Sequence, residues 1–182
     1  DYVRDPTWLP HAWEAKSDAL VFAHLPRDVQ RKATFIDRRF AANVEQSQPA
    51  PLAALPLDAI RDGAGPLHFV FHTSFCCSTL LARALDIPGV SMGLKEPAVL
   101  MAFARHWVGA GETPPALRAL GVSLDLLSRP LAAGETQIVK PSNVANLLAR
   151  EMMRLRPDAK ALVLFSGIDT YLRALVRRGV YG

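Results

Sequence analysis

Short apolar runs alternate with helical patterns from residue 67 to the end of the chain. The runs have the length and composition of buried β-strands and lie at 67–72, 89–95, 136–140 and 159–165. The segments between and after them have apolar residues at helical spacing, at 77–86, 96–108, 116–129, 143–155 and 169–178. Strands that alternate with helices of this length predict right-handed βαβ units. The pattern therefore predicts an α/β fold in which helices cover both faces of a parallel sheet, giving three layers.

The first 62 residues lack this alternation and predict helices joined by connections. In residues 26–40 the apolar positions fall on one face of a helix, and residues 46–56, rich in Pro and Ala, predict an extended linker. We therefore expect an N-terminal helical segment and linker over 1–62 and an α/β domain over 63–182. Because the sequence ends at Gly182, just after a predicted helix, we expect the α/β domain to continue beyond it.

Composition and charge narrow the class of protein. The 182 residues are 50% hydrophobic and 21% charged, as in globular proteins, and no apolar run approaches the ~20 residues that span a bilayer. The N-terminal residues match neither a signal peptide nor a presequence, so we expect a cytoplasmic protein without a membrane partner. The net charge of +4 suits an anionic small molecule. The basic residues are scattered and lack interleaved aromatics, which disfavours a nucleic-acid partner. The oligomeric state is not fixed by these features.

Polar residues gather where the predicted strands end. Ligands of open parallel α/β sheets bind outside the carboxyl ends of the strands. The sequences that follow the four strands are HTSFCCST at 72–79, KEP at 95–97, KPSN at 140–143 and SGIDT at 166–170. Their convergence predicts a polar ligand site at this edge of the sheet.

The loop after the first parallel strand is the strongest candidate for an anion site. Small residues between a strand and a helix present free backbone N–H groups and the positive end of the helix dipole, which together bind phosphate or sulfate. The hydroxyls of Ser78 and Thr79 can add donors. The loop contains neither the Gly nor the Lys of a G-x-x-x-x-G-K-S/T motif, which disfavours ordinary ATP or GTP hydrolysis. In the alternative interpretation, Ser74 or Ser78 only caps the helix.

The adjacent cysteines Cys76 and Cys77 predict neither a disulfide nor a metal site. Neighbouring residues rarely reach disulfide geometry, and the spacing is not the C-x-x-C of zinc sites, even with His72 nearby. We therefore expect no metal. Small buried packing residues and a thiol nucleophile at a helix N-terminus remain alternatives.

The segment SFCCSTLLARAL at 74–85 resembles the phosphosulfate-binding loop of the sulfotransferases, whose bacterial members often read P-R-S-G-S/T-T-L-L. The similarity extends over about 66–179 and is closest in the S-T-L-L-x-x-x-L core. The resemblance implies a P-loop-type α/β fold and the sulfuryl donor 3′-phosphoadenosine 5′-phosphosulfate. It also implies that the loop holds the 5′-phosphate of this nucleotide. The matching positions are Ser74, Cys76, Cys77, Ser78 and Thr79, with Ser166 at the position of a further nucleotide-binding residue.

Two more strand ends are similar to functional positions of this family. GLKEP at 93–97 matches the place of the catalytic base, so the resemblance implies Glu96 as base and Lys95 as charge stabiliser. IVKPSN at 138–143 resembles a Lys-Pro turn in which Lys140 would face the anion. Transfer of a sulfuryl group requires a base for the acceptor and cations for the transferring oxygens. In the alternative, Glu96 is a favourable first-turn carboxylate and both lysines are solvated.

Two departures from the family pattern keep three functions open. Phe75 stands where the family has a basic residue, and Ser166 stands where its 3′-phosphate motif has Arg. The nearest basic residues, Arg173, Arg177 and Arg178, lie a turn or more further along, where the pattern favours a solvated basic helix face. We therefore consider a sulfotransferase-like enzyme acting on an unknown hydroxyl or amine acceptor, a catalytically degenerate P-loop nucleotide-binding or regulatory domain, and a kinase-like phosphotransferase. The sequence leaves open whether the protein is an enzyme.

Overall fold

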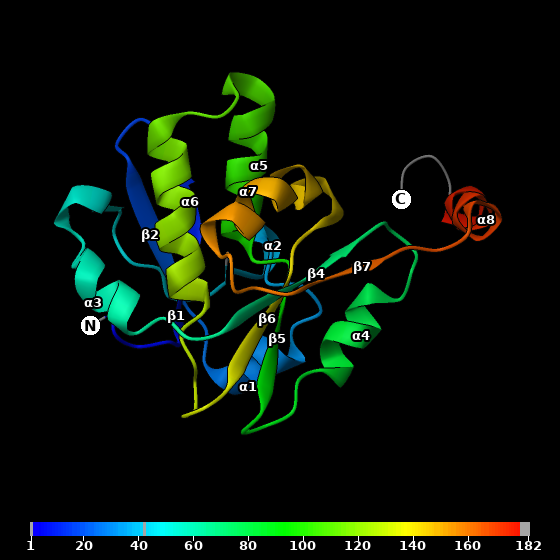
Figure 1. The fold of residues 1–182 in the computed structure, drawn as a ribbon, viewed down its shortest axis with the longest axis horizontal. Helices are drawn as coiled ribbons and strands as arrows, with labels where there is room; N and C mark the ends of the chain where they lie inside the picture. Colours follow the sequence, from blue (N-terminus) through cyan, green and yellow to red (C-terminus); the bar gives the residue numbers. More distant parts are fainter. Residues whose placement is uncertain (1, 42, 179–182) are drawn as a thin grey trace.

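A parallel four-stranded sheet forms the centre of the computed structural model, which describes residues 2–41 and 43–178 (Figure 1). Its strands run in the order β5-β6-β4-β7, and every pair of neighbours is parallel. Their bounds are β4 Leu67–His72, β5 Ser91–Lys95, β6 Thr136–Lys140 and β7 Ala161–Leu164. The predicted parallel sheet is confirmed. β4 and β6 have the predicted bounds, and β5 and β7 are shorter than predicted. The predicted continuation beyond Gly182 lies outside the described residues.

Helices flank the sheet, as the periodicity predicted. Figure 1 shows α4 on one side of it and α5, α6 and α7 on the other, with α8 beyond β7 at the end of the molecule. Each lies within a few residues of a predicted helix, although the segment 143–155 begins as a 3₁₀ helix. The bounds are α4 Ser78–Ala84, α5 Ala98–Ala110, α6 Pro114–Leu127, η2 Asn143–Leu148, α7 Ala149–Leu155 and α8 Ile168–Arg178. No helix of the described chain is long and apolar enough to cross a membrane.

The helical prediction for the N-terminal segment is wrong over residues 8–24. These residues form an antiparallel hairpin of β1 (Trp8–Glu14) and β2 (Ala19–His24), which the short β3 (Ala50–Pro51) extends. The turn between β1 and β2 contains Asp18 at a φ of 45°, a left-handed conformation that Asp tolerates better than most residues.

The helix predicted over 26–40 is interrupted in the middle. Helices α1 (Arg27–Lys32) and α2 (Arg38–Ala41) flank an irregular stretch around Ile36. The amide of Ile36 donates to Lys95 O at 2.6 Å, and Ile36 O accepts from Ala98 N at 3.0 Å. These bonds to the end of β5 replace helical ones, so tertiary pairing overrides the helical periodicity. The segment ends with η1 (Leu52–Ala54) and α3 (Leu57–Asp62).

One hydrophobic core joins the N-terminal segment to the parallel sheet. Trp13 of β1 stacks on Phe103 of α5 with ring centroids 5.0 Å apart. The buried Arg129, just after α6, donates to the backbone oxygens of Val3, Asp5 and Trp8. The core cluster contains residues from both sides of position 62, so the two predicted parts pack as one body.

Candidate functional site

The carboxyl ends of the four parallel strands lie at one edge of the sheet. In the strand register Lys95 lies opposite Lys140, and His72 lies opposite Leu164. Since the strands are parallel, the residues that follow them share this edge, where such sheets bind ligands. The predicted strand-end segments therefore lie along one edge of the sheet, with the segment after β5 at one end of that edge and the segment after β7 at the other.

The loop between β4 and α4 has an unusual backbone. Phe75 and Cys77 have φ values of 59° and 60°, the left-handed region that residues other than glycine seldom occupy. The amide of Thr73 donates to Leu164 O at 3.0 Å, and the thiol of Cys76 donates to Thr73 O at 2.7 Å. Non-glycine residues in this conformation cost of order 1 kcal/mol each and cluster at functional sites.

Successive amides of this loop have no hydrogen-bond acceptor within the described chain. They belong to the five loop residues predicted to bind an anion, Ser74, Cys76, Cys77, Ser78 and Thr79. Consecutive free N–H groups around a left-handed residue form the concave nests that bind anions. The N-cap of α4 is Cys77, which makes no side-chain cap bond, so the proposed capping role of Ser74 or Ser78 is wrong.

A cavity of about 350 Å³ lies beside the loop. Its walls come from three strand ends and from α8, and they include His72, Thr73, Ser74, Asn143, Asn146, Ser166 and Tyr171. Asn146 donates from Nδ2 to His72 O at 2.8 Å. Its Oδ1 and the Oγ of Ser166 are buried without a partner in the described part of the chain. Because buried polar atoms are nearly always satisfied, these two oxygens mark a place for ligand groups or water.

Phe75 contacts the helix after β7. Its ring meets the Tyr171 ring of α8 at a centroid distance of 5.9 Å and an interplanar angle of 64°. Phe75 thus makes an aromatic contact between the loop and α8.

Glu96 and Lys140 form a close ion pair. Lys140 Nζ donates to Glu96 Oε1 at 2.5 Å and lies 5.3 Å from the centre of the Phe35 ring. The side chain of Lys140 is only 1% exposed, so its predicted alternative as a solvated surface lysine is wrong. Glu96 Oε2 accepts no hydrogen bond from any described residue, which leaves this oxygen available to a substrate.

The backbone around Glu96 holds the carboxylate in place. Glu96 has a φ of 56° in the left-handed region. Its amide donates to Lys140 O at 2.7 Å, and the bonds of Ile36 to Lys95 and Ala98 fix the residues on either side. A strained residue fixed on both sides has a defined side-chain direction, as catalytic groups require.

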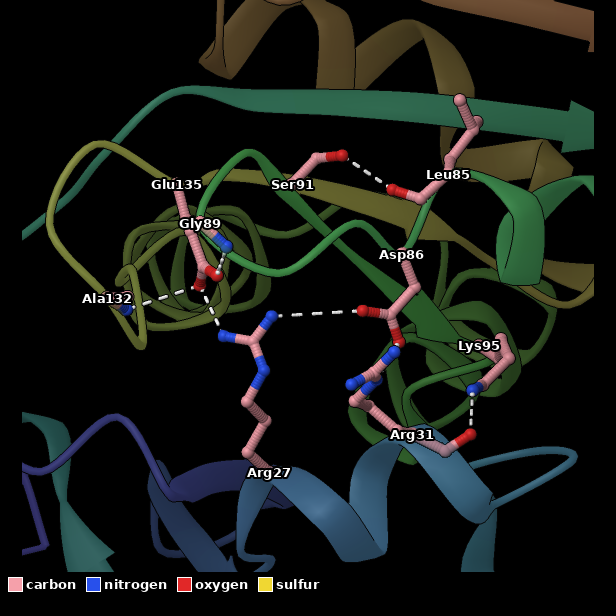
Figure 2. A network of polar contacts seen from close by, with 9 residues as sticks. All are labelled: Arg27, Arg31, Leu85, Asp86, Gly89, Ser91, Lys95, Ala132 and Glu135. Carbon is pink, nitrogen blue, oxygen red and sulfur yellow. Dashed lines mark hydrogen bonds and ion pairs between the residues drawn. The ribbon is translucent and has the colours of Figure 1, made fainter.

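Lys95 does not join this pair. It is fully buried, so the solvated alternative is wrong for this lysine too, and Nζ donates to Arg31 O in the last turn of α1 at 3.0 Å. Figure 2 shows it pointing to Arg31 beside a polar network of Arg27, Asp86 and Glu135. Burial lowers the pKa of Lys95, and the charge of Asp86 only partly opposes this effect. Lys95 therefore satisfies a helix carbonyl.

Four residues of the site were not identified from the sequence as binding residues. His72 contacts Pro141 O through Nε2 at 3.0 Å and links the β4 and β6 ends, while Phe35, Asn146 and Tyr171 come from other segments. Only His72 carried a signal, its position at a strand end. No cluster of three or more potential metal ligands occurs in the described chain.

Comparisons of the chain with protein family models, curated proteins and solved structures found no match. The functional argument therefore rests on the geometry of the site.

Proposed function

We propose that the protein is sulfotransferase-like, with a three-layer P-loop arrangement, and binds a phosphorylated or sulfated adenine nucleotide at the loop 73–79. The run of loop amides without acceptors, at Ser74 and at 76–79, carries this proposal. The adjoining cavity, with the unpartnered oxygens of Asn146 and Ser166, supports it.

The residues present fit part of the expected donor. Loop amides and the hydroxyls of Ser78 and Thr79 suit a 5′-phosphate, and the neutral polar cavity wall suits a ribose or base. The positions of Phe75 and Ser166 supply no positive charge, so further anionic groups of 3′-phosphoadenosine 5′-phosphosulfate require cations from elsewhere. This donor would supply the sulfuryl group, which passes to the acceptor oxygen or nitrogen as the bond to the 5′-phosphate oxygen breaks.

Glu96 is the base in this proposal. Its free Oε2 accepts the proton from the hydroxyl or amine of the acceptor, and its Oε1 stays bonded to Lys140. Lys140 orients the carboxylate through its hydrogen bond to Oε1, which is the role of a positioning residue. Lys95 has no part in this step because its ammonium group serves α1.

A catalytically degenerate nucleotide-binding domain is the second candidate. Two observations favour it. Phe75, at the loop position where a sulfotransferase would have a basic residue, contacts Tyr171 instead of supplying a charge. Lys140 forms an ion pair with Glu96, so its charge is already neutralised within the chain. In that case the nucleotide binds, and transfer does not occur.

A thermal-shift titration with adenosine 3′,5′-bisphosphate tests the binding. Stabilisation should grow with ligand concentration, by about 2.7 kcal/mol at a hundredfold excess over Kd. The Ser78→Ala/Thr79→Ala and Ser166→Ala variants should respond less, while Ser17→Ala, on the exposed β1–β2 turn, should respond as the wild type does. No shift at millimolar ligand contradicts the proposal, and an unchanged shift in the loop variant excludes the hydroxyls of Ser78 and Thr79 as ligands.

Consumption of 3′-phosphoadenosine 5′-phosphosulfate with a set of phenols, alcohols and amines separates the two candidates. The enzyme hypothesis predicts turnover that the Glu96→Gln variant loses while its nucleotide binding persists. Binding without turnover for any acceptor supports the degenerate domain.

A further inference from the structure

Helix α8 exposes its apolar stripe. Ile168, Leu172, Leu175 and Val176 occur at the spacing of one helix face about 100° wide, and all four are exposed. A helix of a folded protein normally buries such a stripe against its own core. α8 instead lies beyond β7 at the end of the molecule (Figure 1). Its apolar stripe is therefore largely uncovered by the described chain.

The strand before this helix is exposed as well. β7 is an edge strand, which pairs only with β4 in the described chain. Leu162 and Val163 point to opposite faces of the sheet and are both exposed, as is Phe165 after the strand. Parallel sheets normally have both faces covered, as they are at β4. Residues 161–165 also contain no charged residue and no proline, which commonly protect a free edge.

The amount of this apolar surface matches one side of a protein interface. The three residues of 162–165 and the four of α8 are between 39% and 81% exposed. With ~180 Å² for a fully exposed residue of this size, they present ~760 Å² together, more than the ~300–600 Å² of the largest apolar patch on a typical monomer. Each partner of a standard interface buries ~800 Å². The surface is therefore large enough for a stable dimer.

The charges beside the stripe complement a second copy of the chain. Asp169 and Arg173 lie one turn apart on the same flank of the stripe, and neither forms an ion pair with another described residue. When two copies of α8 pack antiparallel with Leu172 at a two-fold axis, Asp169 of each copy comes level with Arg173 of the other. Parallel packing would instead place arginine beside arginine. The charge pattern thus favours one orientation of a symmetric pair.

We propose that two copies of this chain form a two-fold symmetric dimer through the exposed apolar surface of β7 and α8. The α8 stripes pack antiparallel against each other, and Asp169 of each copy pairs with Arg173 of the other. The inference goes beyond the proposed function and does not depend on it, because neither the loop nor Glu96 takes part. Since Tyr171 of α8 lines the nucleotide cavity, the dimer also fixes one wall of that cavity.

Sedimentation velocity of the full chain over a range of concentrations measures this association. A species of twice the chain mass should form reversibly. Val176→Asp should raise its dissociation constant at least about thirtyfold, because it places a charge within an apolar contact. Val108→Asp, at an exposed valine of α5, is the matched control and should dimerise as the wild type does. Asp169→Arg and Arg173→Asp should each weaken the dimer, and the variant with both changes should regain it because the pairs re-form with reversed charges.

Three results overturn the dimer. One is a monomer at every concentration up to millimolar, and another is a dimer that Val176→Asp leaves unchanged. The third is a monomer that sediments with vesicles of phosphatidylcholine and phosphatidylserine and that Val176→Asp releases, since a lipid surface then covers the stripe. Because Asp169 and Val176 are exposed in the single chain, the variants should keep the circular dichroism of the wild type, which separates loss of the dimer from loss of the fold. Each of the three results leaves the proposed nucleotide site standing.

Discussion

Gly93 of β5 controls how closely α4, and with it the anion loop, can approach the sheet. A Cβ atom at this position would lie 2.1 Å from Ala82 O in α4, where real contacts stay above about 3 Å. The atom in conflict is backbone, so the whole helix must move by about 1 Å, and no side chain can yield instead. Overpacking of this kind costs about 3 kcal/mol, and the displacement reaches Ser78 and Thr79 at the start of α4. The Gly93→Ala variant should therefore be less stable and should bind the nucleotide more weakly.

Urea denaturation followed by circular dichroism measures the change, with Gly121→Ala in α6 as the matched control. A Cβ atom at Gly121 would meet only Leu155 Cδ2, at 3.7 Å. This is an ordinary contact, so the control should gain about 0.5–1 kcal/mol from higher helix propensity. If Gly93→Ala is as stable as the wild type, the close packing of α4 on β5 is refuted.

Three further predictions concern buried charges. Arg129→Met should lower the free energy of unfolding by about 3 kcal/mol in urea denaturation, because the carbonyls of Val3, Asp5, Trp8 and Leu126 lose their donor. Burial also lowers the pKa of Arg129, to about 10. Unaltered stability would exclude this anchoring. Lys95→Met should bind the nucleotide normally. Burial lowers the pKa of Lys95, so the unfolded chain binds the Lys95 proton more tightly than the folded chain does. Wild-type stability should therefore rise with pH between the pKa of Lys95 in the folded chain and its pKa in the unfolded chain. The Lys95→Met variant should lose this rise. Glu135→Gln should lower the free energy of unfolding by about 2 kcal/mol, since Glu135 accepts hydrogen bonds from Arg27 at 2.6 Å and from two loop amides. Asp58→Asn, which removes an exposed ion pair with Arg61, is the control and should lose less. A smaller loss in Glu135→Gln than in this control would contradict the prediction.

The parallel sheet could be predicted because its strands are short, apolar and separated by helical patterns. β4 and β6 coincide with the predicted runs since both are buried by neighbouring strands and helices. The β1–β2 hairpin was missed because its turn contains Asp18 and lacks the Asn-Gly or Asp-Gly signal, and because the strands do not alternate strictly. Ile36 was placed in a helix because its bonds to the β5 end are tertiary.

The site could be predicted as a place, and only partly as a set of side chains. Parallel strands bring their carboxyl ends together in any register, so the loop and the Glu96 and Lys140 positions followed from the strand pattern. Lys95 and Lys140 are equivalent in sequence, each at the end of a strand. They differ because α1 lies over Lys95, and the position of α1 depends on an N-terminal segment whose fold the sequence did not reveal.

The central claim is that the loop amides bind the anionic group of a nucleotide. An amide-resolved NMR titration of the chain with adenosine 3′,5′-bisphosphate tests it most directly, because it observes the proposed donors themselves. We predict saturable shifts that are largest at the amides of Cys76, Cys77, Ser78 and Thr79, with smaller shifts at Asn146 and Ser166. Shifts that avoid residues 74–79 at saturating ligand would contradict the account.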